Sequence, residues 1–314
     1  MKKLVSLAVS ATILALIYWQ IDLTALAEAF ARTVPATLAV AILMVVPITL
    51  LTAWRLVLLV PREGRMGLGQ STSLILAASA LNMVLPSKMG DLAKSVFMGR
   101  SGALPGTLAL SLVVFEKATD MLALLAWCVL GLALYPHKDW FFLVMTAVVG
   151  VGLLFGVLML GSLAFAEFFF GAASRVLPSR MGEKWETLRQ SWGEMHGFFW
   201  RRRGFCLGIM GLSVFLWFLH LLQIWLFALA LEAPIPFLGN IALVPLAILA
   251  GLLPLTFAGI GTRDAALILL LRPFIEPATG AALGLLCTLR YLLPALGGLP
   301  FLTRYLAELR GTRV

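Results

Sequence analysis

Two broken apolar stretches decide the fold: residues 70–100 read QSTSLILAASALNMVLPSKMGDLAKSVFMGR, and residues 237–272 end in LAGLLPLTFAGIGTRDAALILLLR, which is 249–272. Each has an apolar half, then Leu-Pro, then a polar segment with glycine and an acid, then a second apolar half. Proline removes a backbone donor and glycine exposes the backbone, so neither polar segment can face lipid. We expect two re-entrant hairpins of half-helices. The alternative is two ordinary spans that are kinked at proline.

The composition around these stretches is that of a membrane protein. Of the 314 residues, 61% are hydrophobic and 12% are charged, and the mean hydropathy is +1.00. Soluble domains carry about 25% charged residues, so this composition excludes soluble, disordered, collagen-like and disulfide-scaffold classes. Spans of about 20 residues each use most of the chain and leave no room for a large soluble catalytic domain.

Six other apolar runs are expected to cross the bilayer, at residues 4–19, 34–60, 105–135, 140–165, 204–231 and 277–296. The first follows two lysines and also has the shape of a signal peptide with an A-x-A site at 25–27, although an uncleaved span is the simpler interpretation. After it, Asp22 is a candidate N-cap for a short helix on the outer interface. We predict an all-α polytopic membrane protein with about six transmembrane helices.

The net charge of +9 reports topology. Lys and Arg concentrate in cytoplasmic loops, and residues 167–203 carry seven of them against four Glu. No basic run is interleaved with aromatic residues, so we expect no nucleic-acid partner. The predicted location is the cell (inner) membrane, multi-pass, with both termini cytoplasmic. The segment 167–203 is predicted to be a cytoplasmic amphipathic segment.

A stripe of large apolar residues at helical spacing runs through that segment: Met181, Trp185, Leu188, Trp192, Met195 and Phe199. An amphipathic helix in the inner membrane interface fits this stripe. The alternative is that the stripe packs on the cytoplasmic ends of neighbouring spans.

The positive-inside rule also orients the two hairpins. The first follows a span that ends inside, and the second follows a span that ends outside, so the two are inverted. Each half of the chain then reads span, span, hairpin, span, with Pro86 and Pro254 in corresponding places. We expect a single integral membrane domain, residues 1–314, built from inverted repeats of approximately 1–137 and 138–314.

Charged residues inside the apolar segments are candidates for function, because each costs about 2.5–3.5 kcal/mol to insert. Lys88, Asp91 and Lys94 follow one another at i, i+3 at the start of a half-helix. Their net positive charge beside free backbone N–H groups suits a phosphate. A salt-bridge ladder that holds the hairpin together is the alternative.

The second broken stretch offers a matching segment, Gly259 to Asp264. Gly259 and Gly261 let backbone approach a ligand closely, and Arg263 offers a bidentate fork for phosphate. A Gly-x-Gly sequence alone is weak evidence for a binding site, and this segment matters because it matches the first broken stretch in position and character.

The span at 105–135 carries Glu116, Lys117 and Asp120. The two acids share a helical face, so one interpretation is a proton-coupling site. The other is that they pair with Lys88, Lys94 or Arg263. Arg55 and Arg290 also lie in apolar runs, and snorkelling toward the interface is a sufficient explanation for them.

Cysteine and histidine add no site. Cys128, Cys206 and Cys287 lie apart in apolar runs and read as buried thiols, and the three histidines are scattered. We expect no cofactor and no metal.

The order Asn82-x-x-Leu85-Pro86-x-x-x-Gly90-Asp91-x-x-Lys94, then Glu116-Lys117-x-x-Asp120, then Pro254 with Gly259-x-Gly261-x-Arg263-Asp264, resembles the lysylphosphatidylglycerol synthase transmembrane region family. This family is the flippase-like domain of multiple peptide resistance factors and of stand-alone relatives, some of them hopanoid-associated. The resemblance implies re-entrant helices and movement of polar lipids between leaflets. It places family motif positions at Asn82, Gly90, Asp91, Lys94, Glu116, Asp120, Gly261 and Arg263. Asp264 stands where the family pattern suggests Glu, and without the aminoacyl-transferase domain of two-domain members we do not expect lysyl transfer.

The function that we predict is a lipid flippase or scramblase for an anionic phospholipid or lipid-linked sugar, and not an enzyme. Lys88, Lys94 and Arg263 would contact phosphate, and Asp91, Glu116 and Asp120 would orient those cations or bind an amine. The alternatives are a membrane enzyme with an acid of this set as base, and a proton-coupled exporter of a small anion. The predicted substrate-binding residues are Asn82, Lys88, Gly90, Asp91, Lys94, Glu116, Lys117, Asp120, Gly259, Gly261, Arg263 and Asp264. The predicted partners are membrane lipids (phospholipid, aminoacylated lipid, hopanoid or polyprenyl-linked sugar), a second copy of the chain, and a separate lipid-modifying enzyme.

Overall fold

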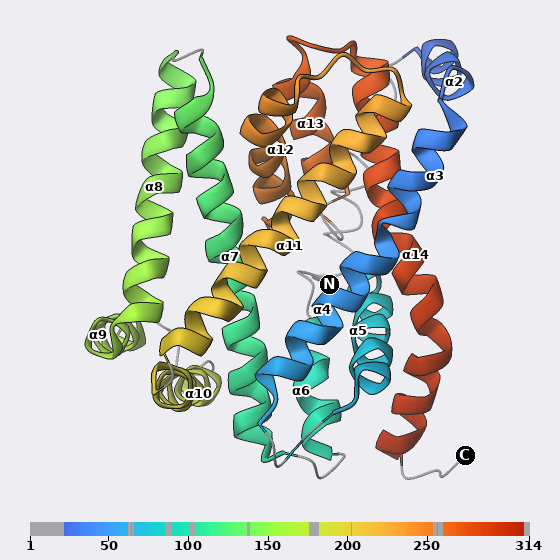
Figure 1. Cartoon of the computed structure of the whole chain (residues 1–314). Coiled ribbons are helices and arrows are strands. Elements are labelled where there is room, and N and C mark those ends of the chain that lie inside the picture. Colours follow the sequence, from blue (N-terminus) through green and yellow to red (C-terminus); the bar gives the residue numbers. More distant parts are fainter. Residues whose placement is uncertain are drawn as a thin grey trace.

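The computed structural model describes residues 22–61, 64, 66–85, 90–100, 104–136, 139–175, 182–201, 203–253, 256 and 260–310. All secondary-structure elements in these ranges are helices (Figure 1). The predicted span at 4–19, both hairpin prolines, Lys88 and Gly259 lie outside the described residues.

Among the described residues, five helical segments are long and apolar enough to cross a membrane, each at a position predicted for a span. They are α3 (Pro35–Leu43) with α4 (Val45–Leu59), α7 (Gly106–Leu134), α8 (Trp140–Gly161), α11 (Arg203–Ala230) and α14 (Pro277–Arg310). The α8 side chains Val148, Val151 and Leu154 are 59–67% exposed, which is costly in water and favourable in lipid. The prediction of an all-α polytopic membrane protein is therefore confirmed.

The last span is longer than predicted. We expected it to end at residue 296, whereas α14 continues to Arg310 through Pro294 and Pro300. Packing explains the extension, because α14 lies along α5 (Leu68–Asn82). A Cβ atom at Gly298 would meet the backbone carbonyl of Leu76, so the two helices touch backbone to backbone there.

The two broken stretches form pairs of short helices. The first pair is α5 and α6 (Gly90–Arg100), and the second is α12 (Phe237–Leu252) and α13 (Thr262–Leu271). The longest has 16 residues, about 24 Å at 1.5 Å per residue, against a hydrocarbon core of about 30 Å. Figure 1 shows α5 and α6 in the lower half and α12 and α13 in the upper half, while α7 and α14 run past both pairs. No single helix of either pair is long enough to span a bilayer.

The contacts of the two pairs are reciprocal. In each pair the second helix packs on the next long helix in the chain, α6 on α7 and α13 on α14. The first helix packs on the long helix of the other half, α5 on α14 and α12 on α7. Gly131 permits the α12 contact, since a Cβ atom there would lie 2.5 Å from the carbonyl oxygen of Ile241. If a two-fold axis relates two inverted repeats, the first short helix of each repeat packs on the long helix of the other in this reciprocal way.

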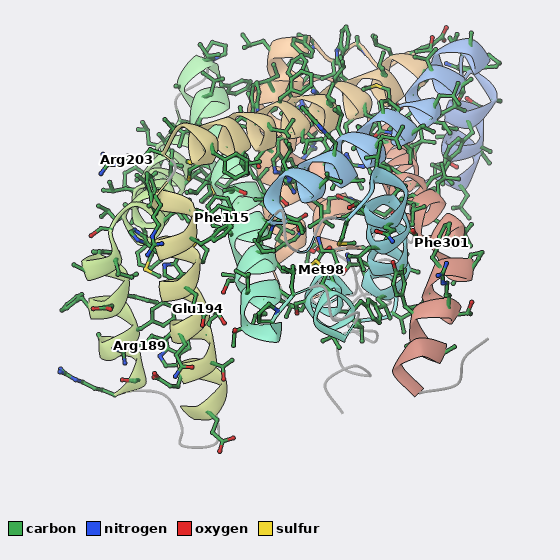
Figure 2. All side chains as sticks on the ribbon, turned by 60° about the horizontal axis from the view of Figure 1, so that its bottom comes forward. Met98, Phe115, Arg189, Glu194, Arg203 and Phe301 are labelled. Atoms are coloured by element: carbon green, nitrogen blue, oxygen red, sulfur yellow. The ribbon has the colours of Figure 1, made fainter. Side chains whose placement is uncertain are left out.

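Except for Met181, which lies outside the described residues, the amphipathic stripe lies on α10 (Gly182–Trp200), which Figure 1 shows nearly end-on, together with α9 (Leu163–Ser174). Figure 2, turned by 60°, shows α9 and α10 side by side, with Arg189 and Glu194 labelled on α10. The ring of Phe199 stacks on Phe115 of α7 with centroids 3.8 Å apart. The indole N–H of Trp192 donates to the carbonyl of Met159 at 3.1 Å. The stripe therefore packs on neighbouring helices, as the alternative prediction has it.

The short helix predicted after Asp22 is α2 (Leu23–Ala31). Asp22 caps it, because its Oδ1 accepts hydrogen bonds from the backbone N of Thr24 at 2.8 Å and from Thr24 Oγ1 at 2.6 Å. These hydrogen bonds favour the ionised carboxyl and lower the pKa of Asp22.

Buried apolar side chains gather in two main clusters. One joins α11, α12, α13 and the C-terminal half of α7, and the other joins α4, α5, α6 and the N-terminal half of α7. The cavity of the candidate site is lined from both clusters, by Ile75 of one and by Trp217, which packs against the other.

Candidate functional site

A cavity of about 220 Å³ lies between the two apolar clusters. A single water needs roughly 10–15 Å³ by the same kind of measure, so the cavity has room for a polar group of many atoms. Its walls come from α4, α5, α6, α7, α11 and α14. The polar side chains that line it are Thr49, Thr52, Arg55, Ser79, Asn82, Asp91, Lys94, Glu116, Lys117, Asp120, Trp217, His220, Gln223, Arg290 and Tyr291.

Six of these residues form a closed ring of alternating charges, in the order Arg55, Glu116, Lys94, Asp91, Lys117 and Asp120. On the buried side Glu116 accepts from Arg55 Nη2 at 3.1 Å and from Lys94 Nζ at 2.7 Å. On the other side Lys117 Nζ lies 2.8 Å from Asp91 Oδ2 and 3.5 Å from Asp120 Oδ2. The Lys94–Asp91 pair at 3.6 Å and the Arg55–Asp120 pair close the ring. Three cations and three anions cancel.

The two sides of the ring differ in exposure. The side chains of Arg55, Glu116 and Lys94 are at most 2% exposed, while those of Asp91, Asp120 and Lys117 are 14%, 23% and 41% exposed. Buried charges persist only when they are paired and hydrogen-bonded, and the inner three meet that condition. The outer three are the ones a ligand can reach.

Arg55 corrects the sequence analysis, which explained it by snorkelling. The side chain is instead 1% exposed in the middle of the ring, and it also donates to Ser213 Oγ of α11 at 2.7 Å. The sequence offered no signal for it, because Lys94 and other cations of the apolar segments were available to balance Glu116 and Asp120.

The structure brings together half of the predicted substrate-binding residues. Asn82, Asp91, Lys94, Glu116, Lys117 and Asp120 all line the cavity. Gly90 lies beside them at the crossing of α5 and α6, where a Cβ atom would lie 2.6 Å from the carbonyl oxygen of Ala78 and from the backbone N of Asn82. Glycine is thus needed at this position for packing.

Gly261, Arg263 and Asp264 form a separate cluster that does not line the cavity. Gly261 has φ of 103°, a conformation that side-chain-bearing residues avoid, and it lets α13 begin. Asp264 Oδ2 accepts from the backbone N of Gly261 at 3.0 Å, and Asp264 Oδ1 accepts from Arg263 Nη2 at 2.6 Å. The cluster fastens α13 to α14, because Arg263 Nη2 also donates to the carbonyl of Gly284 at 3.0 Å and to Thr288 Oγ1 at 2.7 Å.

Arg290 of α14 is a second arginine that snorkelling does not explain. It lines the cavity and is 5% exposed. Its Nη2 donates to Tyr291 Oη at 2.6 Å, and its Nη1 lies 3.3 Å from His220 Nδ1 of α11. The Tyr291 ring lies between Arg290 and Arg263, with centroid distances of 4.6 and 5.7 Å to their Cζ atoms. Tyr291 therefore connects the α13 cluster to the cavity.

Several polar atoms of the cavity residues are buried without a hydrogen-bond partner. Among the described residues these include Asn82 Oδ1, Gln223 Oε1 and Arg290 Nε. Such atoms cost about 1–3 kcal/mol each when nothing pairs with them. A hydrated or ligand-filled cavity removes that cost. No group of His, Cys, Asp and Glu that could hold a metal ion occurs among the described residues.

These features define a polytopic membrane protein with a charged cavity about halfway along its spanning helices. The chain belongs to the family described as "Lysylphosphatidylglycerol synthase TM region", which matches residues 3–298. The resemblance found in the motifs is thereby confirmed. A comparison with curated proteins finds no match. The family and the apolar helices together fit a lipid-related membrane transporter.

Proposed function

We propose that this protein moves a phospholipid or a lipid-linked sugar between leaflets, with the polar headgroup in the cavity and the acyl chains in the bilayer. The observation that carries the proposal is the charge ring at mid-depth. Glu116 and Asp120 lie near the middle of α7, a helix long and apolar enough to span the membrane. Charges at this depth are expensive and mark pathways for polar substrates.

The short helix pairs support the same proposal. We infer that α5 with α6 and α12 with α13 are re-entrant hairpins that enter from opposite sides, because each helix is too short to span and the contacts of the two pairs are reciprocal. Two such hairpins that meet near the midplane would let a headgroup approach the cavity from either leaflet.

The outer side of the ring would meet the headgroup first. Asp91, Asp120 and Lys117 keep partial exposure, so their carboxylate oxygens and ammonium group can exchange partners with a headgroup amine, hydroxyl or phosphate. Lys94 and Arg263 each already have a carboxylate partner, at 2.7 and 2.6 Å. A direct phosphate contact from either would require that pair to open.

The orientation and location follow the charge distribution. The basic segment 167–203 contains α10 and the start of α11, and we propose that it lies on the cytoplasmic side of the cell (inner) membrane with both termini. In Figure 2, Arg189 and Arg203 lie at the same end of the molecule as Glu194.

Exchange of a fluorescent phosphatidylglycerol across proteoliposome membranes tests the proposal. Asp91→Ala should abolish exchange because it removes the acid that joins Lys94 and Lys117, and Arg263→Ala should abolish it by releasing α13 from α14. Size-exclusion profiles and thermal unfolding check folding. Wild-type exchange rates in both variants would remove these residues from the mechanism.

That the chain is not an enzyme stays a prediction. To test it, the purified protein is incubated with candidate lipids, and the lipids are analysed by mass spectrometry. A chemically converted lipid would overturn the prediction. Transport of a soluble anion shares the same architecture and differs only in cargo.

A further inference from the structure

The charge balance of the cavity leaves one cation over. Of the charged side chains that line it among the described residues, the six of the ring cancel, and Arg290 remains. Among the described residues no carboxylate lies within salt-bridge distance of Arg290; its partners are His220 and Tyr291. Its Nε has no hydrogen-bond partner in the part of the chain that the structure describes. Burying a guanidinium that is 5% exposed without a paired anion costs free energy. An anionic ligand in the cavity would supply that anion.

The two halves of the molecule differ in the contacts between the span before the hairpin and the span after it. In the first half, Arg55 of α4 meets two acids of α7, the long helix that follows the hairpin. In the second half, His220 of α11 meets Arg290 of α14, which likewise follows the hairpin. The charges of the first half are therefore paired with one another, whereas the buried Arg290 of the second half lines the cavity without a paired carboxylate among the described residues.

We propose that Arg290 is the anion-binding residue of the cavity and that it binds the phosphate ester of the transported headgroup. This inference rests on the proposed function and names the contact that the function needs. The guanidinium fork matches two phosphate oxygens, and the hydrogen bond from Nη2 to Tyr291 fixes the orientation of the fork. Phosphate is therefore recognised from α14, and the charge ring contacts the rest of the headgroup.

Binding to the purified full chain in detergent tests this inference. The probes are dioctanoyl phosphatidylglycerol, dioctanoylglycerol, which has the same acyl chains without phosphate, and glycerol 3-phosphate. We expect the wild type to bind the phospholipid more tightly than dioctanoylglycerol. Arg290→Gln should weaken phospholipid binding about tenfold, the loss of one charge-assisted contact, and leave dioctanoylglycerol binding unchanged.

The matched control is Arg304→Gln, the same substitution on the exposed part of α14, which should bind both lipids like the wild type. Arg290→Lys keeps the charge without the fork and should lose less affinity than Arg290→Gln. If Arg290→Gln does not fold, Arg290→Lys carries the prediction with a loss of a few fold. Equal phospholipid affinity in all variants, or an equal loss for both lipids, overturns the inference.

The third probe identifies the source of the phosphate. If glycerol 3-phosphate competes with the phospholipid for the wild type and not for Arg290→Gln, a soluble phosphate ester is sufficient for binding. If it does not compete with the phospholipid, the phosphate belongs to a lipid. The experiments also distinguish a failure of this inference from a failure of the proposed function. Phosphate-dependent binding without lipid exchange would refute transport and keep Arg290 as the anion site. Exchange that Arg290→Gln leaves at the wild-type rate would refute the role of Arg290 alone.

Discussion

Replacing Glu116 by Gln should be among the most destabilising single changes in the charge ring. The Glu116 carboxylate is 1% exposed and neutralises both Arg55 and Lys94, at 3.1 and 2.7 Å. The amide keeps the shape and removes the charge, so the ring changes from neutral to a net charge of +1. Breaking a buried ion pair in this way costs about 3–5 kcal/mol. Arg55 and Lys94 keep Asp120 and Asp91 as partners, so we expect the lower end, about 3 kcal/mol.

Thermal unfolding of the purified protein in detergent measures this cost. At roughly 2–4 °C per kcal/mol, Glu116→Gln should lower Tm by about 6–12 °C. The control is Glu28→Gln, which breaks the Glu28–Arg32 pair, whose side chains are 65% and 71% exposed. Exposed helical pairs contribute about 0.3–0.5 kcal/mol, so Tm should fall by no more than about 2 °C.

The double variant Lys94→Met/Glu116→Gln decides whether charge balance is the cause. It restores a net charge of zero and leaves each remaining member of the ring with a partner, Arg55 with Asp120 and Asp91 with Lys117. We expect it to be more stable than Glu116→Gln alone. A double variant that loses the sum of the two single losses would refute the charge-balance argument, because independent sites add.

Three further predictions concern the frame around the cavity. Gly298→Ala should lower Tm strongly, because its Cβ atom would strike the Leu76 backbone on α5, whereas Gly297→Ala, with nothing within 4 Å, should not; equal Tm values would contradict the close contact. Gly261→Ala should cost about 1–2 kcal/mol from its φ of 103°, measured as a loss of Tm, and an unchanged Tm would show that this backbone relaxes freely. Single cysteines can be introduced along 72–98 and 240–272 in a background without Cys128, Cys206 and Cys287. An impermeant thiol reagent should reach both ends of each stretch from the same side of the membrane. Labelling of the two ends from opposite sides would exclude the hairpins.

The sequence predicted the elements of the fold well because membrane spans depend on local composition. Runs of apolar residues placed α7, α8 and α11 correctly, and the Leu-Pro breaks separated α5 from α6 and α12 from α13. The true length of α14 was missed. Its last turns follow Pro300, and there Tyr305 stacks on Phe97 of α6, which is remote in sequence.

The candidate site was harder to predict because its charges balance between helices. The proposed pairing of Glu116 with Lys94 was found, since both residues stand out as charges in apolar surroundings. Arg55 and Arg290 were set aside, because an arginine near the end of a span and one buried at a cavity look the same in sequence. Only the contacts of Arg55 with the acids of α7 and of Arg290 with His220 of α11 separate the two cases.

The most direct test of the account is to fill the cavity. Ser79 lines it from α5, and Ser73, on the same helix, does not. In proteoliposomes, Ser79→Trp should stop the exchange of fluorescent phosphatidylglycerol while the protein stays folded, and Ser73→Trp should exchange it like the wild type. Exchange at the wild-type rate in folded Ser79→Trp would contradict the claim that the headgroup passes through this cavity.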